Sequence, residues 1–315
     1  KRFITSWNID SDFVNQTFYF RRSSTGTSNN TTYFNYEIDW GDGSPKETFT
    51  NNTTPSHVYT STGIYDIAIE GIFPGMATGY RSGNSYLGRP EAEKLLEVKN
   101  WGDVQFSSFY YGFLGCVNMV ITAKDEPTFR EAGNSGGVVA MFGSCRKIKQ
   151  LDLTPFKPML EVSGYYGWNR ICNGMTTVEK IIIPSMTTNL GSSGNYSDHS
   201  FTSAGQSAGM EILNPGSGLS AGTYQTTTDT GDFQIYLNSV DSSGGAIEDQ
   251  IRVINVDNSW SKNAVFNFAG GLQIKLTTEK PGCEFIMKDI IFNHDPRFRY
   301  SWYNAIVSEI NLSNW

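Results

Sequence analysis

The chain is poor in charged residues and has no long apolar run. Asp, Glu, Lys and Arg make up 17% of its 315 residues, whereas an average globular protein has roughly 25%. No run of about 18 apolar residues occurs, so we expect no membrane insertion by this chain. Its basic residues form no stripe and its formal net charge is −7, which argues against nucleic acid as a partner.

Apolar stripes at helical spacing are nearly absent as well, which argues against a helical bundle. Gly, Ser, Thr and Asn are abundant instead, and aromatic residues reach 14%. Gly and Asn tolerate the positive φ angles of tight turns, and aromatic side chains pack well on pleated surfaces. The composition therefore predicts a mainly β protein with many short turns.

Cysteine is scarce, and no two of the four cysteines form a Cys-x-x-Cys pair. Such pairs are typical of zinc fingers and ribbons. Cys116, Cys145 and Cys172 occupy matched places in successive apolar segments. We expect buried free thiols, with a disulfide or a metal ligand as less favoured alternatives, and we predict no metal and no cofactor.

Motifs of common catalytic sites are missing too. The sequence has no Gly-x-Ser-x-Gly elbow, no His-Glu-x-x-His pair and no phosphate-binding loop. Its three histidines, His57, His199 and His294, lie in a strand motif, a loop and a turn. Two carboxylates on distant strands, as in glycoside hydrolases, would escape this test. We predict that the chain is not an enzyme.

Short strand patterns fill residues 1–74. Phe3–Ile9, Tyr33–Trp40 and Tyr65–Glu70 alternate between apolar and polar residues, and turn-rich pieces separate them. Strands at this spacing with no helix between them predict an antiparallel β-sandwich.

The most specific local feature of this part is the Asp-Trp-Gly-Asp-Gly turn at Asp39–Gly43. It is followed by a His-Val-Tyr strand at His57–Tyr59 and by Gly-Ile-Tyr-Asp-Ile at Gly63–Ile67. These three elements, in this order, resemble the polycystic-kidney-disease (PKD) type domain. Asp39 and Asp42 are expected to cap backbone amides of the turn. We prefer this role to a calcium or catalytic pair, because calcium needs six to eight oxygen ligands.

A different pattern follows residues 75–93, which are rich in Gly, Ser and Asn and are predicted to be a linker. From 94 to 315 apolar residues recur in a shared frame, most clearly at Phe142-x-x-Cys145-x-x-Ile148-x-x-Leu151-x-Leu153-x-x-Phe156. The segment Cys172–Met186 repeats this frame, and partial copies lie at Leu96–Trp101, Phe113–Met119, Ile251–Val256 and Val307–Trp315. The period of roughly 20 to 35 residues is typical of leucine-rich repeats.

Such a frame has a physical meaning. The apolar-x-apolar step is one short strand with two inward side chains, and each coil must stack on a neighbour to cover its inner face. The frame therefore predicts an irregular solenoid whose residues 187–250 form inserted loops or a separate third domain. Because the frame is interrupted at Trp315, we expect further protein or a partner to cover that end.

Three segments carry a family resemblance. A Trp-Gly pair lies within Lys94–Asp103, Phe113–Met119 reads Phe-Leu-Gly-Cys-Val-Asn-Met, and Phe142–Leu153 ends on Leu-Asp-Leu. Together with the PKD-like start, their order resembles the BspA-like leucine-rich-repeat surface proteins. The resemblance is good over residues 1–156 and weak through 187–300, where the Phe-x-x-Cys signature is missing. It implies a PKD/immunoglobulin-like β-sandwich followed by an irregular leucine-rich-repeat solenoid.

The resemblance also implies adhesion or recognition rather than catalysis. We expect a surface-exposed protein, on a cell or a virion, that binds a protein or glycan partner through the repeats. A repeated structural or receptor-binding component of a phage virion or filament, in contact with neighbouring copies, is the first alternative. A carbohydrate-active protein with a PKD accessory domain is the second.

Two sets of residues are candidates for the binding surface. The first set lies inside each apolar-x-apolar step and should face outward, although ordinary solvated surface is the simpler interpretation: Glu97, Asp152, Ile182, Asn255 and Asn311. The second set consists of aromatic residues near the predicted corners of the coils, which would either pack inside or bind a sugar or protein: Tyr110, Tyr111, Tyr165, Tyr166 and Trp168.

Overall fold

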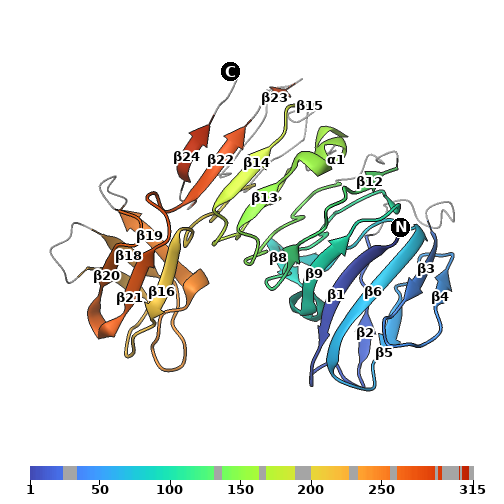
Figure 1. Cartoon of the computed structure of the whole chain (residues 1–315), viewed down its shortest axis with the longest axis horizontal. Helices are drawn as coiled ribbons and strands as arrows, with labels where there is room; N and C mark the ends of the chain where they lie inside the picture. Colours follow the sequence, from blue (N-terminus) through green and yellow to red (C-terminus); the bar gives the residue numbers. More distant parts are fainter. Residues whose placement is uncertain are drawn as a thin grey trace.

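The computed structural model is mainly β, as the composition predicts, and its strands form several separate sheets (Figure 1). It describes residues 1–23, 34–130, 137–162, 168–188, 200–226, 233–255, 261–287, 290–292, 305 and 307–311. A blue-to-cyan first part lies on the right of Figure 1, a group of parallel strands lies in the middle, and an orange part lies on the left.

The first part is built on a six-stranded sheet with the order β11-β9-β1-β6-β3-β4. Its strands are β1 (Phe3–Ile9), β3 (Asn35–Asp39), β4 (Glu47–Phe49), β6 (Gly63–Ile72), β9 (Leu95–Asn100) and β11 (Val120–Ile121). A second layer consists of β2 (Thr17–Tyr19) paired with β5 (Ser56–Val58). Phe18 of this layer packs edge-on against Trp7 of β1, with 5.1 Å between ring centroids, so an aromatic core joins the two layers.

This sheet extends beyond residue 74. The predicted linker contains a hairpin of β7 (Gly79–Ser82) and β8 (Ser85–Gly88) and the 3-10 helix η2 (Pro90–Lys94). After it, β9 pairs antiparallel with β1, and β11 pairs parallel with β9. Leu95 and Val98 of β9 are fully buried. The sheet thus changes from antiparallel to parallel pairing at β9.

All strand pairs in the middle part are parallel. A four-stranded sheet has the order β13-β14-β22-β24. The shorter pairs are β10 with β12 and β15 with β23. The elements of this part are β10 (Gln105–Phe106), β12 (Thr128–Phe129), β13 (Gln150–Asp152), η3 (Thr154–Phe156), α1 (Lys157–Val162), β14 (Lys180–Ile183), β15 (Met186–Thr188), β22 (Cys283–Met287), β23 (Ile290–Phe292) and β24 (Val307–Asn311).

The turns that precede these strands are stacked on one another. The amide of Phe113 donates to the carbonyl of Met141, and the amide of Phe142 donates to that of Ile171, each at 2.8 Å. The partners of these two bonds are 28 and 29 residues apart in the sequence, from Phe113 to Met141 and from Phe142 to Ile171. The same corner conformation recurs, because Tyr111, Ala140 and Arg170 all have positive φ, at 60°, 49° and 56°.

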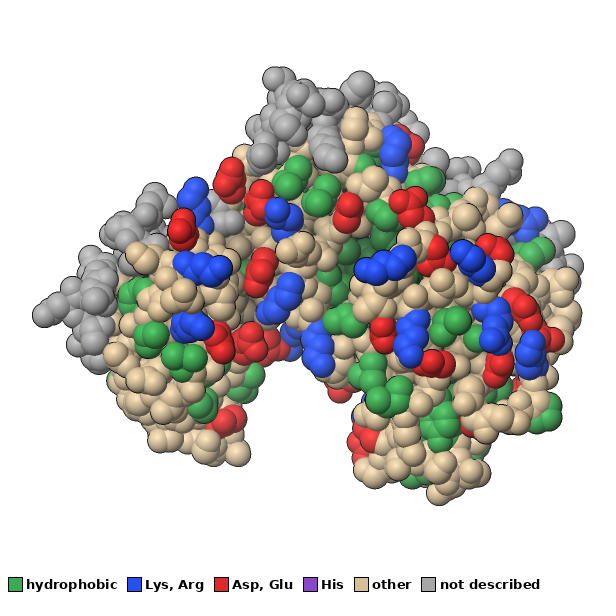
Figure 2. Space-filling model, in the orientation of Figure 1, with side chains coloured by type: hydrophobic (Ala, Val, Ile, Leu, Met, Phe, Trp, Pro, Cys, Tyr) green, Lys and Arg blue, Asp and Glu red, His purple; other side chains and the backbone are tan. Residues whose placement is uncertain are grey.

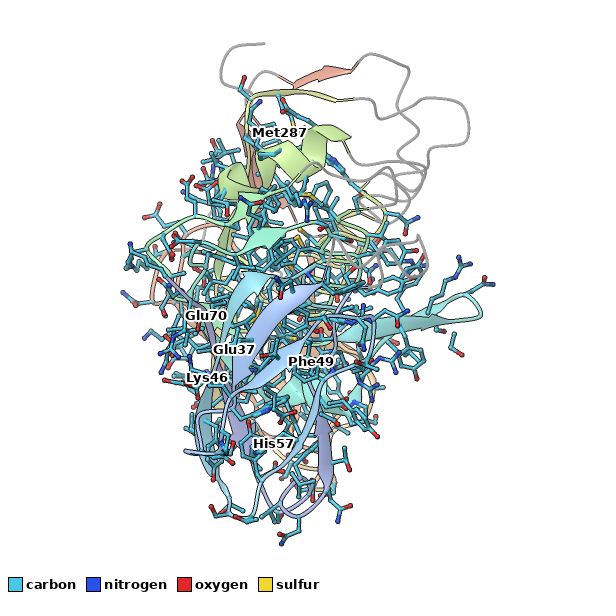
Figure 3. All side chains as sticks on the ribbon, turned by 90° about the vertical axis from the view of Figure 1, so that its right-hand side faces the viewer. Glu37, Lys46, Phe49, His57, Glu70 and Met287 are labelled. Carbon is cyan, nitrogen blue, oxygen red and sulfur yellow. The ribbon has the colours of Figure 1, made fainter. Side chains whose placement is uncertain are left out.

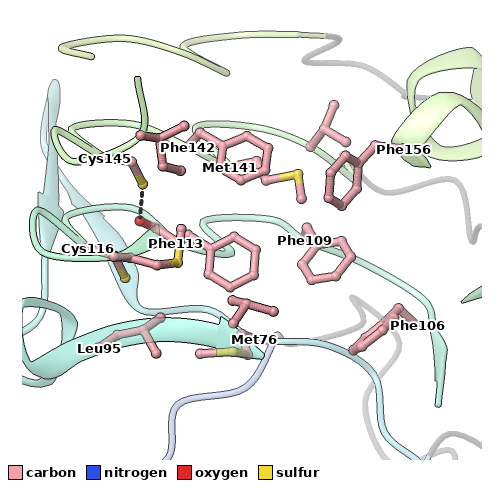
Figure 4. Close-up of a cluster of buried hydrophobic side chains, with 14 of the residues drawn as sticks. Met76, Leu95, Phe106, Phe109, Phe113, Cys116, Met141, Phe142, Cys145 and Phe156 are labelled. Carbon is pink, nitrogen blue, oxygen red and sulfur yellow. Dashed lines mark hydrogen bonds between the residues drawn. The ribbon is translucent and has the colours of Figure 1, made fainter. Parts of the chain in front are cut away.

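The apolar frame of the sequence is buried as predicted. Each of the six frame residues in the two clearest copies, Phe142–Phe156 and Cys172–Met186, is at most 5% exposed. Phe113, Cys116 and Met119 are buried as well. Figure 4 shows the resulting columns, in which Phe113 stacks on Phe142 with ring centroids 5.6 Å apart.

All four cysteines are free and buried, which confirms the expected thiols. In Figure 4 the Cys145 thiol donates to the carbonyl of Phe113, at 3.2 Å. The sequence did not place Cys283 in the frame, yet it begins β22. Cys283 and Phe285 are the inward residues of that strand.

One partial copy of the frame was wrong, because Ile254, which was expected to face inward, is 44% exposed. Ile310 is 49% exposed, but it is the parallel register partner of the buried Phe285 and so lies on the expected inward face of β24. Around Ile254, Ile251 and Val253 are the buried residues of an antiparallel strand. Because side chains alternate along a strand, this phase turns Ile254 to the opposite face.

The orange part is a compact antiparallel unit inserted between two turns of the middle part. It contains two three-stranded sheets, with the orders β16-β21-β20 and β17-β18-β19, around a hydrophobic cluster of their own. Its elements are β16 (Met210–Asn214), β17 (Gly222–Gln225), β18 (Gln234–Leu237), η4 (Glu248–Gln250), β19 (Ile251–Asn255), β20 (Val265–Asn267), η5 (Ala269–Gly271) and β21 (Gln273–Leu276). A separate third domain near residues 190–250 had been one of the two expectations for this stretch, and the inserted unit spans 210–276.

The two ends of the inserted unit lie side by side. Met210 and Leu276 are partners in the β16–β21 ladder. Next to them, the amide of Thr277 donates to the carbonyl of Gly209, at 2.8 Å. An ion pair between Arg146 and Asp249 holds the unit against the middle part.

This geometry predicts that the inserted unit can be removed. Replacing residues 210–276 by a short Gly-Ser linker should leave the rest of the chain folded, because the two cut ends are already neighbours and the hydrophobic clusters are separate. Circular dichroism and a single cooperative thermal transition would check this. A matched deletion of β14, Lys180–Ile183, should abolish the transition. An unfolded 210–276 deletion would contradict the assignment.

The buried thiols predict an unreactive native protein. Burial raises the pKa of the Cys116 thiol to about 12, although a hydrogen bond to Thr78 opposes the shift. Thiolate is the reactive form, so at pH 8 a thiol reagent should label none of the four cysteines until the chain is denatured. The variant Ser242→Cys, at an exposed position, should add one fast-reacting thiol. Rapid labelling of the unmodified native chain would show that the core opens.

Candidate functional site

The outward face of the four-stranded parallel sheet is the candidate site. Strand register aligns Gln150, Lys180 and Glu284 in one row across β13, β14 and β22. Asp152, Ile182 and Ile286 form the next row, two residues further along. The residues between the rows, Leu151, Ile181 and Phe285, are buried, and side chains alternate along a strand. The two rows therefore face outward.

Charge is balanced across this face. Lys180 lies 2.8 Å from Glu284. On the first sheet, Lys99 pairs with Asp66 at 2.9 Å, and Lys46 pairs with Glu37 at 2.7 Å and with Glu70 at 3.0 Å. Figure 2 shows basic and acidic side chains interspersed over this whole side, and Figure 3 labels Glu37, Lys46 and Glu70 along it. Such exposed pairs contribute at most about 1 kcal/mol each to stability. They remove net charge from the face.

Two of the predicted outward residues lie on these sheets and also serve the fold. Glu97 of β9 is half-buried and accepts a hydrogen bond from the hydroxyl of Thr122. Asp152 of β13 is exposed, and its carboxylate accepts the backbone amide of Thr154 at 2.8 Å. Both side chains reach the surface, as expected, and each is oriented by a local hydrogen bond.

The other predicted outward residues are not all brought together. Ile182 lies in the second row, beside Asp152. Asn255 lies in β19 of the inserted unit, which is a different sheet. Asn311 is the register partner of Ile286 in β24. The side chains of Asn255 and Asn311 lie outside the described residues.

The aromatic candidates divide in the same way. Trp168 is 1% exposed, and its indole nitrogen donates to the carbonyl of Leu160 at 3.3 Å, so it packs inside. Tyr165 and Tyr166 lie outside the described residues. Tyr110 and Tyr111 are half-buried at a corner turn. Sequence reasoning missed their neighbour Tyr86, because it lies in the predicted linker.

The Asp39–Gly43 turn is held by its own side chains, as expected. The carboxylate of Asp39 accepts a hydrogen bond from the backbone amide of Gly41 at 3.1 Å, and that of Asp42 accepts one from the amide of Ser44 at 3.0 Å. His57 lies 2.7 Å from Asp42 and stacks on Trp40. Among the described residues, no cluster of three or more His, Cys, Asp or Glu side chains is arranged to hold a metal. His199 and His294 lie outside those residues.

No family model, curated protein or solved structure matches this chain. In the part of the chain that the structure describes, no helix has the length and apolar character needed to cross a membrane.

The Asp42 interactions predict an acid-sensitive turn. Burial raises the pKa of this carboxyl, but hydrogen bonds from Ser44 and His57 outweigh it and lower the pKa to about 2. Because the pKa is lower in the folded state, the ionised carboxylate stabilises the fold at pH values above the unfolded-state pKa of 3.8. This stabilisation is lost as the pH falls towards 2. Asp42→Asn should therefore lower the free energy of unfolding by about 2 kcal/mol at pH 7.

Urea unfolding of both proteins from pH 7 to pH 2.5 would measure this difference. It should shrink steadily below about pH 4. Asp12→Asn, which removes an exposed carboxylate from the same part of the chain, should change the stability by less than about 0.5 kcal/mol. An Asp42→Asn deficit that is constant with pH would show that the shifted carboxyl is not its cause.

Proposed function

We propose that this chain is a surface-exposed recognition protein of the BspA-like leucine-rich-repeat type, with a PKD-like sandwich at its start. It binds a protein or glycan partner through the outward face of the repeats and performs no catalysis. The main support is the pair of outward rows across β13, β14 and β22, which a buried column of frame residues holds in register.

Several features of the face suit recognition. Parallel strands at a spacing of about 4.8 Å give a rigid platform, and its outward residues can vary without disturbing the core. Ile182 and Ile286 are neighbouring, half-exposed apolar side chains beside Lys180 and Glu284. An apolar centre with charged neighbours is the usual composition of a protein interface.

The repeat solenoid is part of the proposal. Its support is the parallel pairing of strands, the backbone bonds between turns about 30 residues apart and the burial of the frame residues. Placement at a cell or virion surface rests on the resemblance.

Binding should depend on the apolar centre of the face. The chain would be tested against a glycan array and a panel of purified extracellular-matrix proteins. We expect binding to at least one probe, and we expect Ile182→Asp with Ile286→Asp to weaken it at least about tenfold, because a charge cannot replace a desolvated apolar contact. The milder pair Ile182→Thr and Ile286→Thr keeps the β-branched shape and should give a smaller loss.

The matched control is Ile64→Asp, which changes a 66% exposed isoleucine on β6 and should leave binding intact. The proposal would be contradicted if the chain bound no probe, or if both double variants bound with the same affinity as the unmodified chain. Assembly of the purified chain into large particles in sedimentation would instead favour the virion component.

A further inference from the structure

A patch of arginine and tyrosine side chains lies on the opposite side of the molecule from the candidate face. We define the Arg–Tyr patch as Arg81, Tyr86, Tyr110, Tyr111 and Arg170. Figure 3 shows the β7–β8 hairpin, which carries two of these residues, projecting away from the side on which Glu37, Lys46 and Glu70 lie.

Three separate segments build the patch. Arg81 and Tyr86 are register partners in the hairpin and share one of its faces. Tyr111 and Arg170 hold matched positions in the stacked corner turns, both with positive φ. The hairpin is fixed to these corners by the amide of Gly79, which donates to the carbonyl of Tyr111 at 3.3 Å.

Both guanidinium groups lie near one tyrosine ring. The central carbon of Arg170 is 4.5 Å from the centroid of Tyr86, and that of Arg81 is 5.7 Å away. The ring of Tyr111 meets Tyr86 edge-on, with centroids 5.7 Å apart. Tyr110 packs beside Tyr111 at 4.2 Å, and their hydroxyls are 3.2 Å apart. A small apolar cluster of Leu114, Val139 and Ala140 lies beneath the tyrosines.

The charge of the patch is not balanced like that of the candidate face. Arg2, Arg21 and Arg146 pair with carboxylates. Within the described ranges, neither Arg81 nor Arg170 forms an ion pair with a carboxylate. Arg81 uses its Nε to reach the carbonyl of Gly83 at 2.7 Å, so its two terminal nitrogens remain for another acceptor. Two guanidinium groups that form no ion pair with a described carboxylate thus lie near one tyrosine ring, in a chain of net charge −7.

Non-glycine residues with positive φ are uncommon, and such strain is often found at binding sites. Tyr111 and Arg170 adopt it at φ 60° and 56°. Ala140, between them in the stack, does so at 49°. The corner turns thus hold a tyrosine and an arginine at matched positions, where the hairpin covers them.

We propose that the Arg–Tyr patch binds an acidic saccharide, that is, a sugar unit carrying a carboxylate or a sulfate. Guanidinium groups bind these anions through paired, charge-assisted hydrogen bonds. A half-exposed tyrosine ring offers an apolar face on which a sugar ring packs, and its hydroxyl offers a polar contact. Arg81 and Arg170, whose guanidinium groups lie over the Tyr86 ring, bind the anion, while Tyr110 contacts the sugar ring. This site shares no residue with the rows on β13, β14 and β22, so each proposal is tested independently of the other.

Calorimetric titration of the whole chain would test the proposal with four probes. Oligogalacturonate carries carboxylates only, and a heparin-derived hexasaccharide carries sulfates in addition to carboxylates. Binding of the first shows that a carboxylate suffices, and binding of the second alone shows that sulfate is required. A neutral cello-oligosaccharide and a polyglutamate peptide are the controls. We expect at least one acidic saccharide to bind, with an affinity that falls as salt is added, and we expect weaker or no binding of both controls.

Variants would then locate the site. Arg81→Gln with Arg170→Gln should lower the affinity about tenfold or more, and Tyr86→Leu should lower it separately. Arg89→Gln removes one positive charge, half of that lost in the double variant, from the end of the hairpin, where Arg89 stacks on Tyr80 at 4.9 Å. It should have less than about a twofold effect. Unchanged melting temperatures would show that the variants fold.

Three outcomes would overturn the proposal. They are the absence of binding to either acidic saccharide, equal binding of the neutral sugar or polyglutamate, and affinity that survives the double arginine variant. Equal binding of polyglutamate would favour an acidic protein as the occupant. None of these results affects the candidate face, whose isoleucine variants leave the Arg–Tyr patch intact.

Discussion

The amide of Phe113 donates to Met141, the amide of Phe142 donates to Ile171, and the amide of Cys172 donates to Ser200. These bonds tie each turn of the chain to the turn that follows it, and they set the spacing of everything attached to the turns. They place Phe113 against Phe142 in the core, and they bring β13, β14 and β22 into one parallel sheet. A buried backbone amide without a hydrogen-bond partner costs folding free energy. A turn that failed to stack would leave such amides unpaired, and the adjacent turns would be destabilised as well.

The extent to which the sequence predicted this structure depends on the segment. Phe142–Phe156 and Cys172–Met186 were predicted residue by residue, because six apolar positions at fixed spacing leave few other arrangements. Ile251–Val256 showed a similar short pattern in the sequence, but Ile251–Asn255 form an antiparallel strand of the inserted unit. A short apolar run does not specify which neighbour its strand pairs with. That depends on contacts distant in the sequence, here with Gln234–Leu237.

The candidate sites divide along the same line. The outward positions of β13 and β14 follow from alternation once the inward residues are known. The Arg–Tyr patch does not follow from alternation along a strand, because it joins a hairpin at residues 79–88 to corner turns near 111 and 170. Those segments meet only when the turns have stacked. For Trp168, the sequence left both inward packing and binding open, and the structure shows that this residue packs inside.

The neck of the inserted unit has an evolutionary consequence. Gly209 and Thr277 are joined by a backbone hydrogen bond, and the unit leaves and re-enters the stack at this one place. An inserted segment of any length fits there if its two ends lie side by side, because it does not alter the spacing of the turns before and after it. Relatives of this chain should therefore vary most in length at this position, with the stack itself unchanged.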